Sequence, residues 1–98
     1  MSVYLVSVCE ITNMSNELKE YAQQSAELIK KFGGSYVTRG PASEVYEGEM
    51  LANKSVIITK FPDIESLHAF WESVEYSVIK PKREGTGIYN IGVYQGAE

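Results

Sequence analysis

Cysteine and histidine are almost missing from this 98-residue chain, which contains one of each, Cys9 and His68. A single cysteine cannot form a disulfide within the chain, so nothing in the sequence calls for an oxidising compartment. A zinc site needs three or four protein ligands, and one thiol with one imidazole leaves the rest to carboxylates. The sequence therefore predicts no metal site. It also lacks a glycine-rich phosphate loop, and we expect no bound cofactor.

Positive charge is scarce as well. Nine lysines and arginines stand against 13 acidic residues, which gives a formal net charge of −4. The only arginines are Arg39 and Arg83, so the chain lacks the clustered basic surface that holds nucleic acid or anionic membranes. No apolar run approaches the length of a membrane span. The apolar residues 1–9 lack the basic region of a signal peptide, and we expect a cytoplasmic protein.

Hydrophobic periodicity divides the first part of the chain into a strand and a helix. Residues 3–10 are rich in β-branched side chains and predict a strand. Residues 15–32 change to a helical period, with Ser15 as the N-cap and Gly33 as the left-handed stop. The apolar stripe of this helix consists of Leu18, Tyr21, Ala22, Ser25, Leu28, Ile29 and Phe32.

The middle and the end of the chain contain further strands. Residues 35–39 predict a second strand, which is broken at Gly40 and which we expect to resume at residues 44–47. Residues 55–61 and 88–94 predict two more strands, again from their β-branched and aromatic side chains. These strands leave room for one more helical region between residues 61 and 88.

That helical region begins at Asp63, which is a good N-cap residue. A shorter helical stretch follows and is interrupted at Pro81. The resulting order is β-α-β-β-α-β, which predicts a single α+β domain over residues 1–98 with a ferredoxin-like four-stranded antiparallel sheet and two helices on one face. The inner face of the second helix is expected to comprise Ile64, Leu67, Phe70, Trp71 and Val74.

The first, third and last predicted strands are apolar on both faces, which is unusual for an antiparallel sheet. Two helices can cover only one face, and a solvated second face would show alternating polar residues. The chain has no further element to cover it, so we predict a homodimer in which the sheets of two copies pack together. In the first strand the two sets are Tyr4, Val6 and Val8 on one face and Val3, Leu5 and Cys9 on the other.

Few side chains could carry catalysis. Cys9 lies within an apolar strand, where a free cysteine usually behaves as a small hydrophobic residue. His68 lies at the edge of the apolar stripe of the second helix. It is either a half-buried boundary residue or a general acid or base, because its ordinary pKa is near neutral.

A cleft between the helices and the sheet could bring the remaining polar and aromatic side chains together. An arginine there would select an anionic or carbonyl-bearing ligand through its planar donor fork. The alternative is that an Arg–Glu pair ties the second strand to the following loop, with the tryptophan and tyrosines as core. The candidate ligand-binding residues are Arg39, Glu47, Trp71, Tyr76, Arg83, Tyr21 and His68.

A series of short motifs resembles the DUF1330 family of uncharacterised proteins, within the dimeric α+β barrel superfamily. The motifs are, in order, Gly33-Gly34, Arg39-Gly40, Glu47-Gly48, Phe61-Pro62, Ser73-Val74-Glu75-Tyr76 and Arg83. The chain departs from the family pattern at Pro41, where another glycine is usual, and at Val74, where a proline is usual. The resemblance implies a ferredoxin-like fold and a homodimer, but no common activity.

The resemblance leaves two functions open. The protein is either a small-molecule-binding homodimer, which includes the case of a cofactor-free enzyme, or a non-catalytic structural or accessory dimer whose Arg/Glu set only stabilises the fold. Members of the same superfamily include cofactor-free monooxygenases and haem-degrading enzymes. The haem-degrading members resemble one another through an Asn–Trp–His set, and the spacing of Trp71 and His68 does not fit it. No haem is therefore expected.

Overall fold

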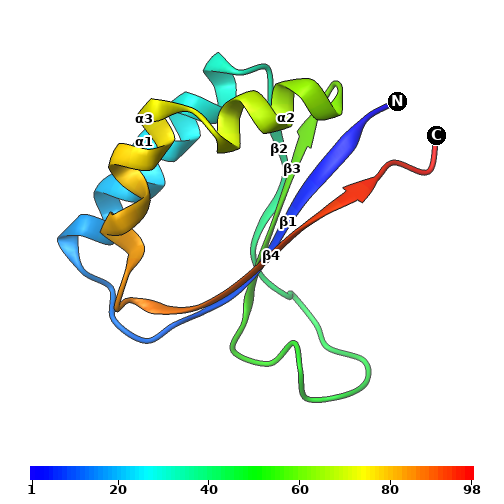
Figure 1. The fold of residues 1–98 in the computed structure, drawn as a ribbon. Helices are drawn as coiled ribbons and strands as arrows, with labels where there is room; N and C mark the ends of the chain where they lie inside the picture. The colour runs from blue at the N-terminus through cyan, green and yellow to red at the C-terminus, as the bar shows by residue number, and fades with distance from the viewer.

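The computed structural model describes residues 1–98 and consists of a four-stranded antiparallel sheet with all helices on one face (Figure 1). The strand order β2-β3-β1-β4 places the N-terminal strand in the middle of the sheet. The predicted β-α-β-β-α-β order is confirmed. The elements are β1 Val3–Ile11, α1 Asn16–Lys31, β2 Ser35–Pro41, β3 Ser55–Phe61, α2 Ile64–Trp71, α3 Val74–Ile79, the 3-10 turn η1 Lys80–Arg83 and β4 Gly87–Gln95.

The helix ends follow the predicted chemistry. The backbone N–H of Leu18 donates to Ser15 Oγ over 3.0 Å, so Ser15 caps α1. Gly33 has a φ of +88°, which is the left-handed conformation expected after the helix. The N–H of Ser66 donates to Asp63 Oδ1 over 2.7 Å, so Asp63 caps α2. Both caps satisfy N–H groups that a helix leaves without partners in its first turn.

The core lies between the helices and one face of the sheet. Phe61 of β3 is completely buried and packs against Phe70 of α2, with ring centroids 5.7 Å apart. Tyr76 of α3 continues this aromatic stack at 4.8 Å from Phe70. The stack fixes where α3 lies and therefore where the turn that follows it begins.

Two details of the predicted secondary structure are wrong. No strand resumes at residues 44–47; residues 42–54, which we call the arm, form a long loop between β2 and β3. Because β2 is an edge strand, its continuation has a neighbour only in β3, and that pairing ends at Pro41 and Ser55. Val74 does not belong to the inner face of α2. It is 76% exposed, since α2 ends at Trp71 and α3 starts a new helix after Ser73.

The second face of the sheet carries no helix (Figure 1). The register of the strands assigns to this face, which we call the open face, residues that alternate with those beneath the helices. They are mostly apolar, as the sequence predicted. The open face includes Tyr4, Val6, Val8 and Glu10 of β1, Val56, Ile58 and Lys60 of β3, and Ile88, Asn90, Gly92 and Tyr94 of β4.

Candidate ligand-binding cleft

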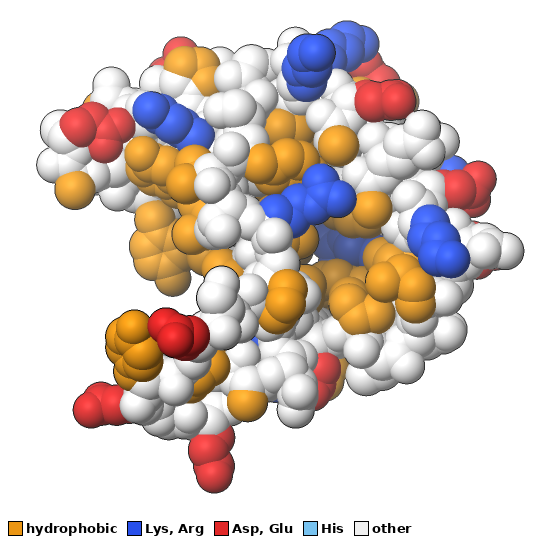
Figure 2. Space-filling view, turned by 180° about the vertical axis from the view of Figure 1, so that it is seen from behind, with side chains coloured by type: hydrophobic (Ala, Val, Ile, Leu, Met, Phe, Trp, Pro, Cys, Tyr) orange, Lys and Arg blue, Asp and Glu red, His pale blue; other side chains and the backbone are white.

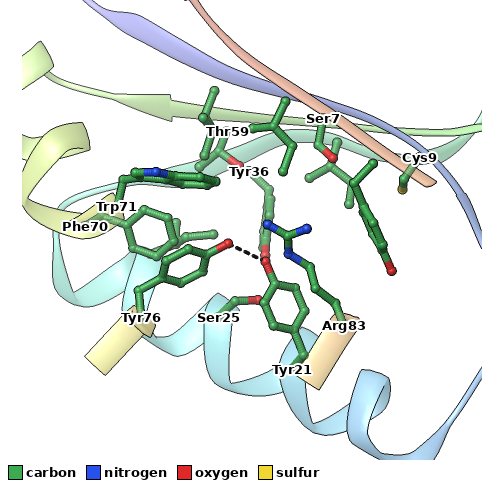
Figure 3. A pocket seen from close by; sticks show the side chains of 15 residues that line it. Ser7, Cys9, Tyr21, Ser25, Tyr36, Thr59, Phe70, Trp71, Tyr76 and Arg83 are labelled. Atoms are coloured by element: carbon green, nitrogen blue, oxygen red, sulfur yellow. Dashed lines mark hydrogen bonds between the residues drawn. The ribbon is translucent and has the colours of Figure 1, made fainter. Parts of the chain in front are cut away.

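A small chamber lies between the helices and the sheet, with a volume of about 80 Å³ (Figure 3). It adjoins a wider outer compartment of about 800 Å³ between α1, β2 and the end of β1. The two spaces share a stretch of wall and together form one cleft. The shared residues are Cys9, Tyr21, Ser25, Tyr36, Ile57 and Tyr89.

Arg83 supplies the charge of the inner chamber. It is the last residue of η1, where Pro81 ends the helical run, and its side chain returns toward α1 and the sheet (Figure 3). The guanidinium carbon lies 4.9 Å from the ring centroid of Tyr89 and 5.8 Å from that of Tyr21. Its Nε is buried and has no hydrogen-bond partner. A buried donor without a partner costs about 1–3 kcal/mol, so this nitrogen is suited to an acceptor that enters the chamber.

Two phenol groups meet beside this guanidinium. The hydroxyl groups of Tyr21 and Tyr76 lie 2.7 Å apart in a hydrogen bond (Figure 3). One phenol must donate in this bond and the other accept, so the accepting phenol keeps a proton that it can offer elsewhere. Burial raises the pKa of Tyr21 strongly, and the neighbouring Tyr76 adds to the increase, while Arg83 opposes it. Tyr21 is therefore a neutral donor at physiological pH.

Trp71 and the capped start of α3 complete the chamber. The indole of Trp71 packs against the ring of Tyr76 with centroids 5.1 Å apart, and the ammonium group of Lys80 lies 4.7 Å from the Trp71 ring. Ser73 Oγ accepts from the N–H of Tyr76 over 3.0 Å and donates to the carbonyl of Phe70 over 2.8 Å. This short connection holds Tyr76 at the turn between α2 and α3, so its hydroxyl faces α1.

A family model described as a domain of unknown function, DUF1330, matches residues 2–97 of this chain. The chain belongs to the DUF1330 family. The resemblance inferred from its short motifs is thereby confirmed. A comparison with curated proteins finds no match.

Solved structures share the fold of this DUF1330 chain. RPA0582, a protein of unknown function from Rhodopseudomonas palustris, has a TM-score of 0.80 at 11% identity, over 99% of this chain and 83% of its own. SnoaB, a cofactor-independent oxygenase from Streptomyces nogalater, has a TM-score of 0.71 at 12% identity, over 99% and 94%. The nipsnap family protein Atu4242 from Agrobacterium tumefaciens, of unknown function, has a TM-score of 0.63 at 16% identity, over 99% and 89%. At such identities the likeness shows the fold alone, that of the dimeric α+β barrel proteins.

The predicted site residues of the DUF1330 chain separate into two groups. Tyr21, Trp71, Tyr76 and Arg83 line the inner chamber together. Arg39 lies farther out, in the wall of the outer compartment, with its guanidinium carbon 4.9 Å from the ring centroid of Tyr36. The structure thus brings the four inner residues together from α1, α2, α3 and η1.

Glu47 and His68 do not line this cleft. Glu47 lies on the exposed arm, because β2 ends before it and carries no further pairing. His68 is exposed on α2, because it follows Leu67, which occupies the buried face of the helix. It borders a separate hollow together with Glu72. The ion pairs of the chain join Lys31 to Glu75 and Lys54 to Glu10, so Arg39 and Glu47 do not form the predicted strand-to-loop pair.

Several cleft residues were not predicted. Tyr36 and Tyr89 fall on the helix-facing side of β2 and β4, which only the strand register shows, and both line the inner chamber together with Arg83. Cys9 borders both compartments, although its thiol is 4% exposed and lies 3.6 Å from the carbonyl oxygen of Ser55. Burial raises the pKa of Cys9, which keeps it a thiol and makes it a poor nucleophile. Alternation along β1 could have placed Cys9 beneath the helices.

No helix of the chain is both long enough and apolar enough to span a bilayer.

Proposed function

We propose that this protein is a homodimer that binds a small anionic or carbonyl-bearing molecule in the cleft, with Arg83 as the anchor. The observation that carries the proposal is the buried Nε of Arg83, which has no partner in the protein. Buried polar groups are almost always hydrogen-bonded, and an exception calls for a functional or structural explanation. A ligand oxygen would provide the missing acceptor.

The neighbouring donors favour the same ligand chemistry. The Tyr21–Tyr76 pair has one hydrogen bond between two hydroxyl groups, so a phenol proton remains available next to the guanidinium. Two kinds of donor directed at one small space select an acceptor group, such as a carboxylate or a ketone oxygen.

The volumes limit what can enter. The inner chamber of about 80 Å³ is larger than the roughly 10–15 Å³ that a cavity needs to hold one water molecule, so it suits the head group of a ligand. The outer compartment of about 800 Å³ lies in the range of roughly 300–1,000 Å³ that is usual for small-molecule sites. We infer a ligand whose oxygen-bearing head reaches Arg83 and whose body occupies the outer compartment.

The same donors also suit a cofactor-free enzyme. Hydrogen-bond donors aimed at an oxygen on which negative charge develops stabilise a transition state as well as a bound anion. SnoaB, which shares the fold, is a cofactor-independent oxygenase. Turnover of a bound ligand without added cofactor would extend the proposal from a binding protein to an enzyme.

The open face supports the proposed homodimer. Val6, Val8 and Ile58 lie on a sheet face that no element of the chain covers. A second copy of the same sheet is the simplest apolar partner, and a two-fold interface would join the same patch from both copies.

The test is a thermal-shift screen of small aliphatic and aromatic carboxylates and ketones, followed by calorimetric titration of the best hit. Arg83→Lys keeps the charge but loses the planar fork, and we expect it to weaken binding about tenfold or more with little change in unfolding midpoint. Arg39→Lys tests the outer wall in the same way, and we expect a smaller loss of affinity from it, because Arg39 can contact only the body of the ligand. If Arg83→Lys instead lowers stability and leaves binding unchanged, the alternative holds, namely a structural or accessory dimer in which these side chains only stabilise the fold.

A further inference from the structure

The arm is a conspicuously exposed part of the chain. Every residue from 41 to 53 is exposed, although the segment contains large apolar side chains. Tyr46 is 89% exposed and Met50 76%, and the only side-chain hydrogen bond within the arm joins Tyr46 to Glu44. Isolated apolar residues on a surface are common, but two of this size on one projecting loop call for a partner.

The arm stands next to the open face. In Figure 1 it projects from the ends of β2 and β3 on the side of the sheet away from the helices. A hollow of about 230 Å³ lies where it joins the sheet, and its walls combine Leu51 and Ser43 of the arm with Thr38 of β2 and Val56 of the open face. Figure 2 shows the arm as a separate lobe that carries apolar and acidic side chains, with an indentation between it and the rest of the molecule. A body that covers the open face would therefore also touch the arm.

We propose that the arm clasps a second copy of this chain. The inference rests on the proposed homodimer and adds a second contact surface to it. In a two-fold dimer each copy would contribute one arm, so the contact forms twice. Tyrosine and methionine are enriched at such interfaces because they supply a large contact area.

Charge supports the same partner. The arm contains Glu44, Glu47 and Glu49, and its one basic residue, Lys54, is paired with Glu10 of β1. The open face carries Lys60, which is exposed. Opposite charges on the arm of one copy and the open face of the other would complement each other, whereas two arms in contact would repel. In this proposal Glu47, which the sequence predicted as a ligand-binding residue, lies at the dimer interface instead of in the cleft.

The first test measures the dimer by sedimentation over a range of concentrations. We expect the double variant Tyr46→Ser/Met50→Ser to raise the dimer dissociation constant about tenfold or more, with unchanged far-ultraviolet circular dichroism. The matched control is Val74→Ser/Val78→Ser, which removes side chains of 76% and 67% exposure from α3 on the helix side, and which should leave the dissociation constant unchanged. An unchanged dissociation constant in the arm variant overturns the clasp and leaves the homodimer standing. A monomeric wild type overturns both.

The second test is direct. Zero-length carbodiimide coupling of a mixture of ¹⁴N- and ¹⁵N-labelled protein joins carboxylates to lysines in contact, and mass spectrometry separates links within a copy from links between copies. We expect mixed-isotope links that include an arm glutamate. An intact dimer whose mixed-isotope links all lie outside residues 42–54 would refute the clasp. Binding of the arm to a different protein instead of a second copy would refute it as well.

Discussion

At the scale of single residues, the cleft contains more hydrogen-bond donors than acceptors. Arg83 Nε has no partner, and the Tyr21 and Tyr76 hydroxyls share one hydrogen bond. In a low-dielectric space an unpaired donor is costly. If the proposed ligand supplies the missing acceptor, its binding will stabilise the folded protein.

The Tyr21 hydroxyl provides a pH test of this environment. Its pKa is raised in the folded protein, whereas a tyrosine in the unfolded chain ionises near pH ~10. Above that pH the unfolded state loses a proton that the folded state keeps. The stability due to this group is complete below pH ~10 and falls as the pH rises further.

We therefore expect Tyr21→Phe to lose about 1 kcal/mol at neutral pH, from the missing hydrogen bond, and to lose less additional stability than wild type in alkali. Urea unfolding at neutral and alkaline pH measures both effects. Parallel loss of stability in alkali for Tyr21→Phe and wild type would contradict the raised pKa.

The sequence predicted part of this site for a physical reason. Tyr21 and Trp71 lie on apolar helix stripes, so their inward direction follows from the 3.6-residue period. The positions of Tyr36 and Tyr89 depend on strand register, which a single sequence determines weakly. Glu47 could not be placed, because no local pattern distinguishes a loop that returns to the cleft from one that projects away from it.

At the scale of elements, α2 depends on its cap. The Asp63 carboxylate accepts from the N–H of Ser66 over 2.7 Å, and hydrogen bonding to the side chain and then to the backbone of Ser66 lowers the pKa of Asp63. A lowered pKa means that its contribution is present above the ordinary aspartate pKa of about 3.9 and is lost as the pH falls through the folded value.

We expect Asp63→Ala to lower the urea midpoint at neutral pH, because the first-turn N–H group loses its acceptor. Asp63→Asn keeps a capping oxygen and should stay close to wild type. The difference between wild type and the Ala variant should shrink as the pH is lowered. Equal midpoints for the Ala and Asn variants at neutral pH would show that the cap does not stabilise α2.

The break between α2 and α3 was harder to foresee than the cap. Periodicity predicted that Val74 belongs to the inner face of α2. Instead, Ser73 Oγ donates to the carbonyl of Phe70 near the end of α2 and accepts from the N–H of Tyr76 at the start of α3. Serine is compatible with a helix interior and with a cap, so local preference did not decide between one helix and two. The break allows Tyr76 to point toward Tyr21, and the site depends on it.

At the scale of the whole molecule, the open face is the basis of the proposed homodimer. The sequence predicted this face correctly, because strands with apolar residues on both sides need two covers. Val6 lies opposite Ile58 in the centre of the sheet. An aspartate at this position would be buried without a partner in the proposed dimer.

We expect Val6→Asp to dissociate the homodimer or to unfold the protein, as sedimentation and circular dichroism would show. Val78→Asp places the same charge on an exposed position of α3 and should leave the dimer intact. A Val6→Asp variant that remains a folded dimer would show that the second copy binds elsewhere.

The central position of β1 has a consequence for how the protein is made. Val3 lies opposite Phe61 of β3 on one side and opposite Gln95 of β4 on the other. During translation β1 is therefore synthesised before either of the strands with which it pairs. Until β4 has been synthesised, an edge of a strand with two apolar faces stays unpaired, and such edges are where nascent chains associate wrongly. The sheet can therefore be completed only after β4 has been synthesised.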